Sequence, residues 1–201
     1  GGKESQASNY GAFTALATHV TGRATKIRLN REQDMAWTGK RHPFSSTYRA
    51  GFDKDGRILG FEVEITSDGG FVTDLSGPVL DRALFHLDNA YYIPAVKFTG
   101  RVAHTTLPSN TAFRGFGGPQ GMVVIEDAME RAAHRLGLPP EELRRRNYYG
   151  PSPRNLAPYG QAITDPRVVA MHDRLVDEAE LEARREEITA FNASSRFHKR
   201  G

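Results

Sequence analysis

The sequence contains no cysteine and no run of 18 or more apolar residues. The first absence excludes disulfides, thiolate nucleophiles, zinc knuckles and iron–sulfur clusters ligated by this chain. The second excludes a transmembrane helix, and no secretory signal pattern is found. The net charge is also small, because 27 Lys and Arg residues against 24 Asp and Glu residues leave a formal charge of only +3. We therefore expect no membrane or nucleic-acid partner, and a cytoplasmic location.

The composition is that of a folding protein. Its 201 residues are 38% hydrophobic and 25% charged, which is enough for one large or two small domains with a sizeable core. The sequence opens Gly-Gly-Lys-Glu without a methionine, so we expect a fragment of a longer protein.

Hydrophobic periodicity predicts both helices and strands. Helices are expected at residues 4–21, 79–87, 119–136 and 141–147, with one long charged helix from 164 toward 191, and β-prone segments at 26–29, 48–52, 57–65 and 96–102. Asp55-Gly56 is a strong hairpin signal, after which Leu59, Phe61, Val63 and Ile65 are expected to face one way. The fold class is therefore α+β, with antiparallel strands packed against helices. A proline-marked linker divides a main part, residues 1–150, from a tail, residues 151–201.

The densest chemical signal is Ser-Asn-Thr-Ala-Phe-Arg-Gly-Phe-Gly-Gly-Pro-Gln at residues 109–120. Its glycines let backbone approach a ligand, and the helix that follows directs free N–H groups toward the same place. Arg114 offers a planar cation for phosphate or carboxylate, and Phe113 and Phe116 offer flat apolar surfaces. An ordinary tight turn with aromatic residues in the core explains the same pattern from spacing alone.

Arg82 lies in a second cluster, Asp-Arg-Ala-Leu-Phe-His at residues 81–86. In a low-dielectric position it would stabilise developing negative charge, whereas the alternative is a surface ion pair with Asp81 or Asp88. His86 and His104 are interpreted as structural residues, and no pair of His residues has metal-site spacing, so no metal ligand is predicted. Glu4, just before the first helix, is either a favourable charge at its N-terminus or a substrate contact.

Four separated motifs occur together in one order: Gly-Gly-Lys-Glu-Ser-Gln at 1–6, Thr-Gly-Lys-Arg-His-Pro-Phe at 38–44, Arg-Ala-Leu-Phe-His at 82–86, and residues 110–120. Together they resemble the molybdenum-binding subunit of the xanthine dehydrogenase family, which includes xanthine oxidases and aldehyde oxidases. The resemblance implies that residues 1–150 are part of a molybdopterin-binding domain. It implies that the tail, residues 151–201, leads into the C-terminal part of the subunit.

The family's chemistry implies a role for each matching residue. Glu4 would hydrogen-bond a purine substrate, Arg82 would stabilise charge on the purine oxygen as the catalytic residue, and Phe116 would stack on the ring. Arg114 and Gly1 would contact the molybdopterin-molybdenum cofactor. The related aldehyde oxidases tend to carry apolar residues where Glu4 and Arg82 stand, so the resemblance favours hypoxanthine or xanthine as substrate. Aldehydes, other N-heterocycles, and a non-catalytic phosphate-binding or assembly role are the alternatives.

The sequence departs from the family in one respect. The family's catalytic base is a glutamate in a C-terminal Gly-Glu-Pro motif, which this chain does not contain. We therefore expect the isolated chain to bind little cofactor and to be inactive. FAD and 2Fe-2S clusters are expected on other domains or a partner subunit of an oligomeric enzyme, and the choice of NAD or oxygen as electron acceptor is made at the flavin.

Overall fold

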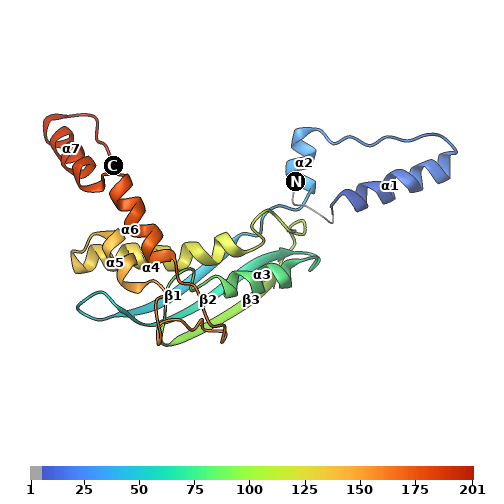
Figure 1. The fold of residues 1–201 in the computed structure, drawn as a ribbon. Coiled ribbons are helices and arrows are strands. Elements are labelled where there is room, and N and C mark those ends of the chain that lie inside the picture. The colour runs from blue at the N-terminus through green and yellow to red at the C-terminus, as the bar shows by residue number, and fades with distance from the viewer. Residues whose placement is uncertain (1–5) are drawn as a thin grey trace.

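The computed structural model describes residues 6–201, which contain seven helices and three strands. Their bounds are α1 Gln6–Thr21, α2 Arg31–Trp37, β1 Phe44–Phe52, β2 Ile58–Gly70, α3 Ser76–Phe85, β3 Val96–His104, α4 Gly118–Leu136, α5 Pro140–Asn147, α6 Val168–Glu178 and α7 Leu181–Ser194. The expected α+β class is confirmed. Figure 1 shows a central body of sheet and helices, from which α1 and α2 extend on one side and α6 and α7 on the other.

The sheet has the order β1-β2-β3. β1 and β2 form the predicted antiparallel hairpin, and Gly56 in its turn adopts φ +77°, a conformation that favours glycine. β3 runs parallel to β2, so the sheet is mixed and the antiparallel description holds only for the hairpin. A parallel neighbour requires a crossover connection, and α3 lies in that crossover.

The alternation of β2 is interrupted near its start. Phe61, Val63 and Ile65 are buried as expected, but Leu59 is 54% exposed. The pairing register shifts between Gly51 and Phe52, which leaves Leu59 as the extra residue of a bulge. The prediction that Leu59 shares the buried face is therefore wrong.

The core lies between the sheet and two helices. Phe61, Val63 and Ile65 of β2 pack in one cluster with residues of α3 and α4, among them Ala83 and Met129. α4 ends where the helix predicted at residues 119–136 ends, and Gly137 caps it with φ +67°, a left-handed conformation. This core fixes α3 and the start of α4 relative to the sheet.

Asn147 at the end of α5 fastens the hairpin turn to the body. Its side chain is fully buried, accepts a hydrogen bond from Ile58 N at 2.8 Å, and donates to the carbonyls of Gly56 at 2.7 Å and Leu143 at 2.8 Å. We expect Asn147→Ala to destabilise this contact by about 2 to 4 kcal/mol, because it leaves buried polar groups unpaired. Faster hydrogen exchange of the hairpin peptides in the full-length protein checks this. Asn192→Ala is the control, because the Asn192 side chain bonds to the backbone of Arg200 near the C-terminus. Unchanged exchange in Asn147→Ala would contradict the assignment.

The two ends of the chain differ from expectation in three places. Residues 26–29 form no strand, whereas α2 was not predicted although Asn30 and Gln33 make a capping box at its start. The long charged helix is two helices, α6 and α7, separated at Glu180 with φ +49°. The apolar stripe of α1 is exposed, with Phe13 at 58% and Val20 at 74%. No helix within residues 6–201 is long and apolar enough to cross a membrane.

Candidate functional site

The glycine-rich segment forms a tight loop that leads into α4. Gly115, Phe116 and Gly117 have consecutive positive φ values of 99°, 51° and 94°. Phe116 adopts this conformation in spite of its side chain, within a turn that its N–H closes by donating to the carbonyl of Phe113 at 2.7 Å. The backbone here is strongly constrained, as is common at ligand-binding sites.

This loop docks on α3 through backbone atoms. A Cβ atom on Gly117 would lie 1.9 Å from the carbonyl oxygen of Val79, and one on Gly121 would lie 2.1 Å from that of Ala83. No side chain fits at either position. Val79 and Ala83 flank Arg82 along α3, and Gly117 directly follows Phe116. The docking therefore brings the helix that carries Arg82 to the loop that carries Arg114 and Phe116.

Arg82 is exposed on α3, and its Nε donates to His86 Nε2 at 3.4 Å. Within residues 6–201 no carboxylate forms an ion pair with it, so the alternative of pairing with Asp81 or Asp88 is not borne out there. Asp88 is buried and accepts a hydrogen bond from the Tyr149 hydroxyl at 2.5 Å. Burial raises the pKa of Asp88. The guanidinium of Arg82 is thus open to a ligand.

Arg41 contacts the glycine-rich loop through its guanidinium. Its Nη2 donates to the carbonyl of Arg114 at 2.6 Å, and its guanidinium lies 4.3 Å from the centre of the Phe113 ring. One face of Phe113 is therefore covered by a cation. The side chain of Arg114 is exposed and forms no ion pair with any residue from 6 to 201. Arg41 belongs to the motif at residues 38–44, but no role for it was predicted from the sequence.

Buried polar atoms without a partner gather around this loop. In the described part of the chain there are four, and three of them are Arg41 Nη1, His42 Nδ1 and Gln120 Oε1. Gln120 Nε2 donates to the carbonyl of His42 at 3.4 Å, and His42 Nε2 lies 2.7 Å from Ser76 Oγ at the start of α3. Burial lowers the pKa of His42 against the opposing effect of Asp74 and Asp68, which favours the neutral form of the ring.

These features fit an anionic, polar cofactor such as molybdopterin. Buried polar groups are normally hydrogen-bonded, so the unpartnered atoms favour a polar ligand at this place. The loop leads into the first turn of α4, where helix N–H groups lack intrahelical partners, and exposed Arg114 offers a cation suited to phosphate. Arg114 and the loop backbone are therefore the described residues that would hold the group. Among residues 6–201, no cluster of three His, Asp or Glu could hold a metal ion directly.

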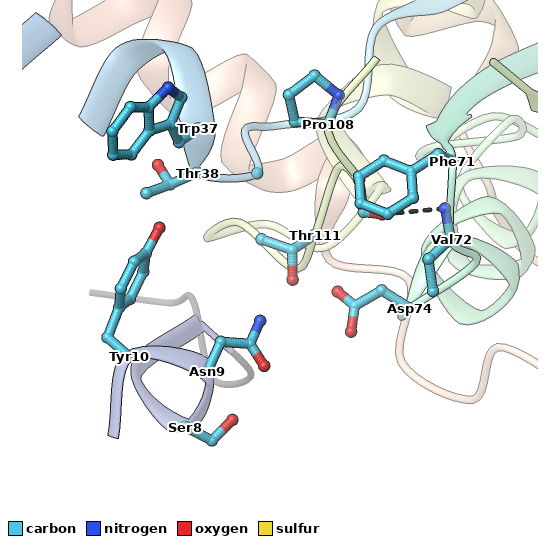
Figure 2. Close-up of a pocket in the computed structure, with 12 residues that line it drawn as sticks. Ser8, Asn9, Tyr10, Trp37, Thr38, Phe71, Val72, Asp74, Pro108 and Thr111 are labelled. Carbon is cyan, nitrogen blue, oxygen red and sulfur yellow. Dashed lines mark hydrogen bonds between the residues drawn. The ribbon is translucent and has the colours of Figure 1, made fainter. Parts of the chain in front are cut away.

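A cavity of about 460 Å³ opens beside the loop. Figure 2 shows it between the start of α1, the end of α2 and the segments at residues 71–74 and 108–111, where Ser109 Oγ accepts a hydrogen bond from Val72 N at 3.0 Å. Tyr10 and Trp37 supply aromatic surface, and Asp74 and Thr111 supply polar groups. Arg82, Arg114 and Phe116 do not line this cavity. This cavity was not predicted, because it joins segments that are distant along the chain.

Two residues of the predicted site, Gly1 and Glu4, lie outside the described residues. Docking of α3 on the glycine-rich loop brings together the elements that carry Arg82, Arg114 and Phe116. His86, interpreted from the sequence as structural, contacts Arg82 and the first residue of α4. The contact of His86 with Arg82 could have been predicted from the sequence, because residues four apart on a helix are neighbours.

The fold and this site define a class of protein. Residues 1–148 match the molybdopterin cofactor-binding domain, and the chain belongs to this family. The resemblance drawn from the four motifs is confirmed, because the chain is 44% identical over all 201 residues to xanthine dehydrogenase/oxidase of Rattus norvegicus. It is 38% identical over 202 aligned residues to a nicotinate hydroxylase of Emericella nidulans. The chain spans only 15% of the length of each of these relatives.

A solved structure shows the same fold. Aldehyde oxidoreductase from Desulfovibrio gigas superposes with a TM-score of 0.81 and 31% identity, over 89% of this chain and 19% of that one. The arrangement of helices on a mixed sheet is thus shared with an enzyme that is named for another substrate class than the rat relative.

Proposed function

We propose that this chain is a section of the molybdenum subunit of a xanthine dehydrogenase, which oxidises hypoxanthine and xanthine to urate in purine metabolism. The observation that carries the proposal is the docking of α3 on the glycine-rich loop. It holds Arg82, which has no carboxylate partner among residues 6–201, beside a loop suited to an anionic cofactor. The 44% identity to the rat protein over the whole chain supports the substrate class.

Each residue has a distinct task in this proposal. When bound, the molybdenum cofactor supplies the two-electron redox chemistry by which a water-derived oxygen is added to a purine carbon. Arg82 stabilises the negative charge that develops on a purine oxygen, because a guanidinium fixed in place acts most strongly on such charge. Phe116 stacks on the purine plane, and Glu4 hydrogen-bonds the purine. Arg114 and Gly1 contact the cofactor.

The remaining parts of the reaction belong to other segments. We propose that electrons pass to 2Fe-2S and FAD centres on other domains or a partner subunit, since this chain has no cysteine to ligate a cluster. The complete enzyme is proposed to be cytoplasmic and oligomeric.

A second candidate is a molybdenum hydroxylase for another N-heterocycle or an aldehyde. The 38% identity to a nicotinate hydroxylase over the whole chain favours it. The test is turnover by the full-length subunit, expressed with its neighbouring subunit in a host that makes molybdopterin, with xanthine, nicotinate and an aldehyde compared. Xanthine turnover well above the other two supports the first proposal, and preference for another substrate rejects it. Bound cofactor without turnover of any of the three also rejects it, and absence of cofactor favours the phosphate-binding or assembly role.

The isolated chain is expected to be inactive and nearly free of molybdenum. It lacks the Gly-Glu-Pro motif of the family's catalytic base, and its loop accounts for only part of a cofactor site. Metal analysis of purified residues 1–201 checks this against the full-length subunit prepared in the same host. A stoichiometric molybdenum signal in the short chain would contradict the expectation.

A further inference from the structure

His86 lies at the point where Arg82 and the cofactor loop meet. It sits one helical turn after Arg82 on α3, and its Nε2 accepts the hydrogen bond from Arg82 Nε at 3.4 Å. Because Nε2 is the acceptor, a proton on the neutral ring is carried by Nδ1. The imidazole thereby restrains the guanidinium of Arg82 by accepting from the Arg82 Nε–H group. The two terminal nitrogens of Arg82 stay available for a ligand.

The imidazole is itself held by the loop. A Cβ atom on Gly118, the first residue of α4, would lie 3.2 Å from His86 Cδ2 and 3.6 Å from Nε2. The ring thus lies over Gly118, on the turn that follows Phe116, so close that a side chain at this position would crowd it. Backbone contact at Gly117 and Gly121 keeps this spacing fixed.

We propose that His86 is a positioning residue, which sets the direction of the Arg82 guanidinium relative to the loop and so determines selectivity for purines over aldehydes. The inference rests on the proposed function of Arg82. An exposed arginine has many rotamers. A fixed acceptor one helical turn away restricts them before the substrate arrives, so less conformational entropy is lost when the substrate binds. An aldehyde makes no use of this arginine, so its oxidation should not depend on His86.

The test uses two variants of the full-length enzyme. His86→Leu keeps much of the volume and removes the acceptor, whereas His86→Gln places an amide oxygen near the position of Nε2. We expect His86→Leu to lower kcat/KM for xanthine roughly 10- to 100-fold, with aldehyde turnover and molybdenum content within about twofold of the unaltered enzyme. His86→Gln is expected to recover most of the lost xanthine activity.

Other outcomes separate this inference from the proposed function. Equal losses with both substrates, or loss of molybdenum in both variants, would show a purely structural role and overturn it. Crystal structures of the substrate-free variants give a readout independent of substrate: Arg82 should leave its position in His86→Leu and keep it in His86→Gln. An unmoved Arg82 in His86→Leu overturns the inference. If Arg82 moves as expected but the unaltered enzyme does not oxidise xanthine, positioning by His86 stands and the purine assignment fails.

Discussion

Replacing Arg82 by methionine in the full-length enzyme is expected to lower kcat for xanthine roughly 10²- to 10³-fold, the usual effect of removing one charge-stabilising donor. Adding Glu4→Val should abolish measurable xanthine turnover, because both proposed polar contacts to the purine are then absent. Aldehyde turnover should be spared or improved, since neither side chain pairs with a simple aldehyde and an apolar site suits it better.

Steady-state kinetics with both substrates, normalised to molybdenum content, measure this effect. Arg135→Met is a matched control, because Arg135 is an exposed arginine on α4 without an ion pair among residues 6–201. Unchanged xanthine turnover in Arg82→Met would reject the role of Arg82. A parallel loss of aldehyde turnover would show that the residue supports the fold or the cofactor instead.

The second large effect is expected at Gly117. An alanine there would place its Cβ 1.9 Å from the carbonyl oxygen of Val79, at a residue whose φ is +94°. The atom met is rigid helix backbone, so α3 and α4 must separate, and we expect a destabilisation of roughly 3 kcal/mol or more. The loop would shift with them, so molybdenum content should fall as well.

The control for this prediction lies in α3 itself. A Cβ on Gly77 would meet no atom within 4 Å, so Gly77→Ala should leave stability nearly unchanged. Thermal denaturation and metal analysis of the two full-length variants are the measurements. Equal denaturation temperatures and full metal content in Gly117→Ala would refute the backbone contact.

Local sequence signals predicted the fold well where short-range rules decide it. The Asp55-Gly56 turn and the end of the helix predicted at residues 119–136 depend on a few adjacent residues, and both are confirmed. The parallel pairing of β3 with β2 could not be predicted in this way, because strand direction is set by the crossover and its packing. The break at Glu180 was missed because no glycine or proline marks it.

The candidate site was predictable only in part. The motifs supplied Arg82, Arg114 and Phe116, but not the contacts that join their elements, since these depend on carbonyl oxygens of α3 that carry no sequence signature. Arg41 and His42 belonged to a noted motif, yet their place under the loop follows from tertiary packing alone. The roles of Gly1 and Glu4 remain predictions from the resemblance.

The contact between α3 and the loop is made by main-chain atoms, which has a consequence for how such a site can diversify. Because Val79 and Ala83 contribute carbonyl oxygens, the side chain at position 82 takes no part in holding the two elements together. A descendant gene can exchange that side chain for an apolar one and keep the scaffold. A new substrate preference can thus arise by exchange of this one side chain, whereas a side chain at Gly117 or Gly121 would collide with the backbone of α3.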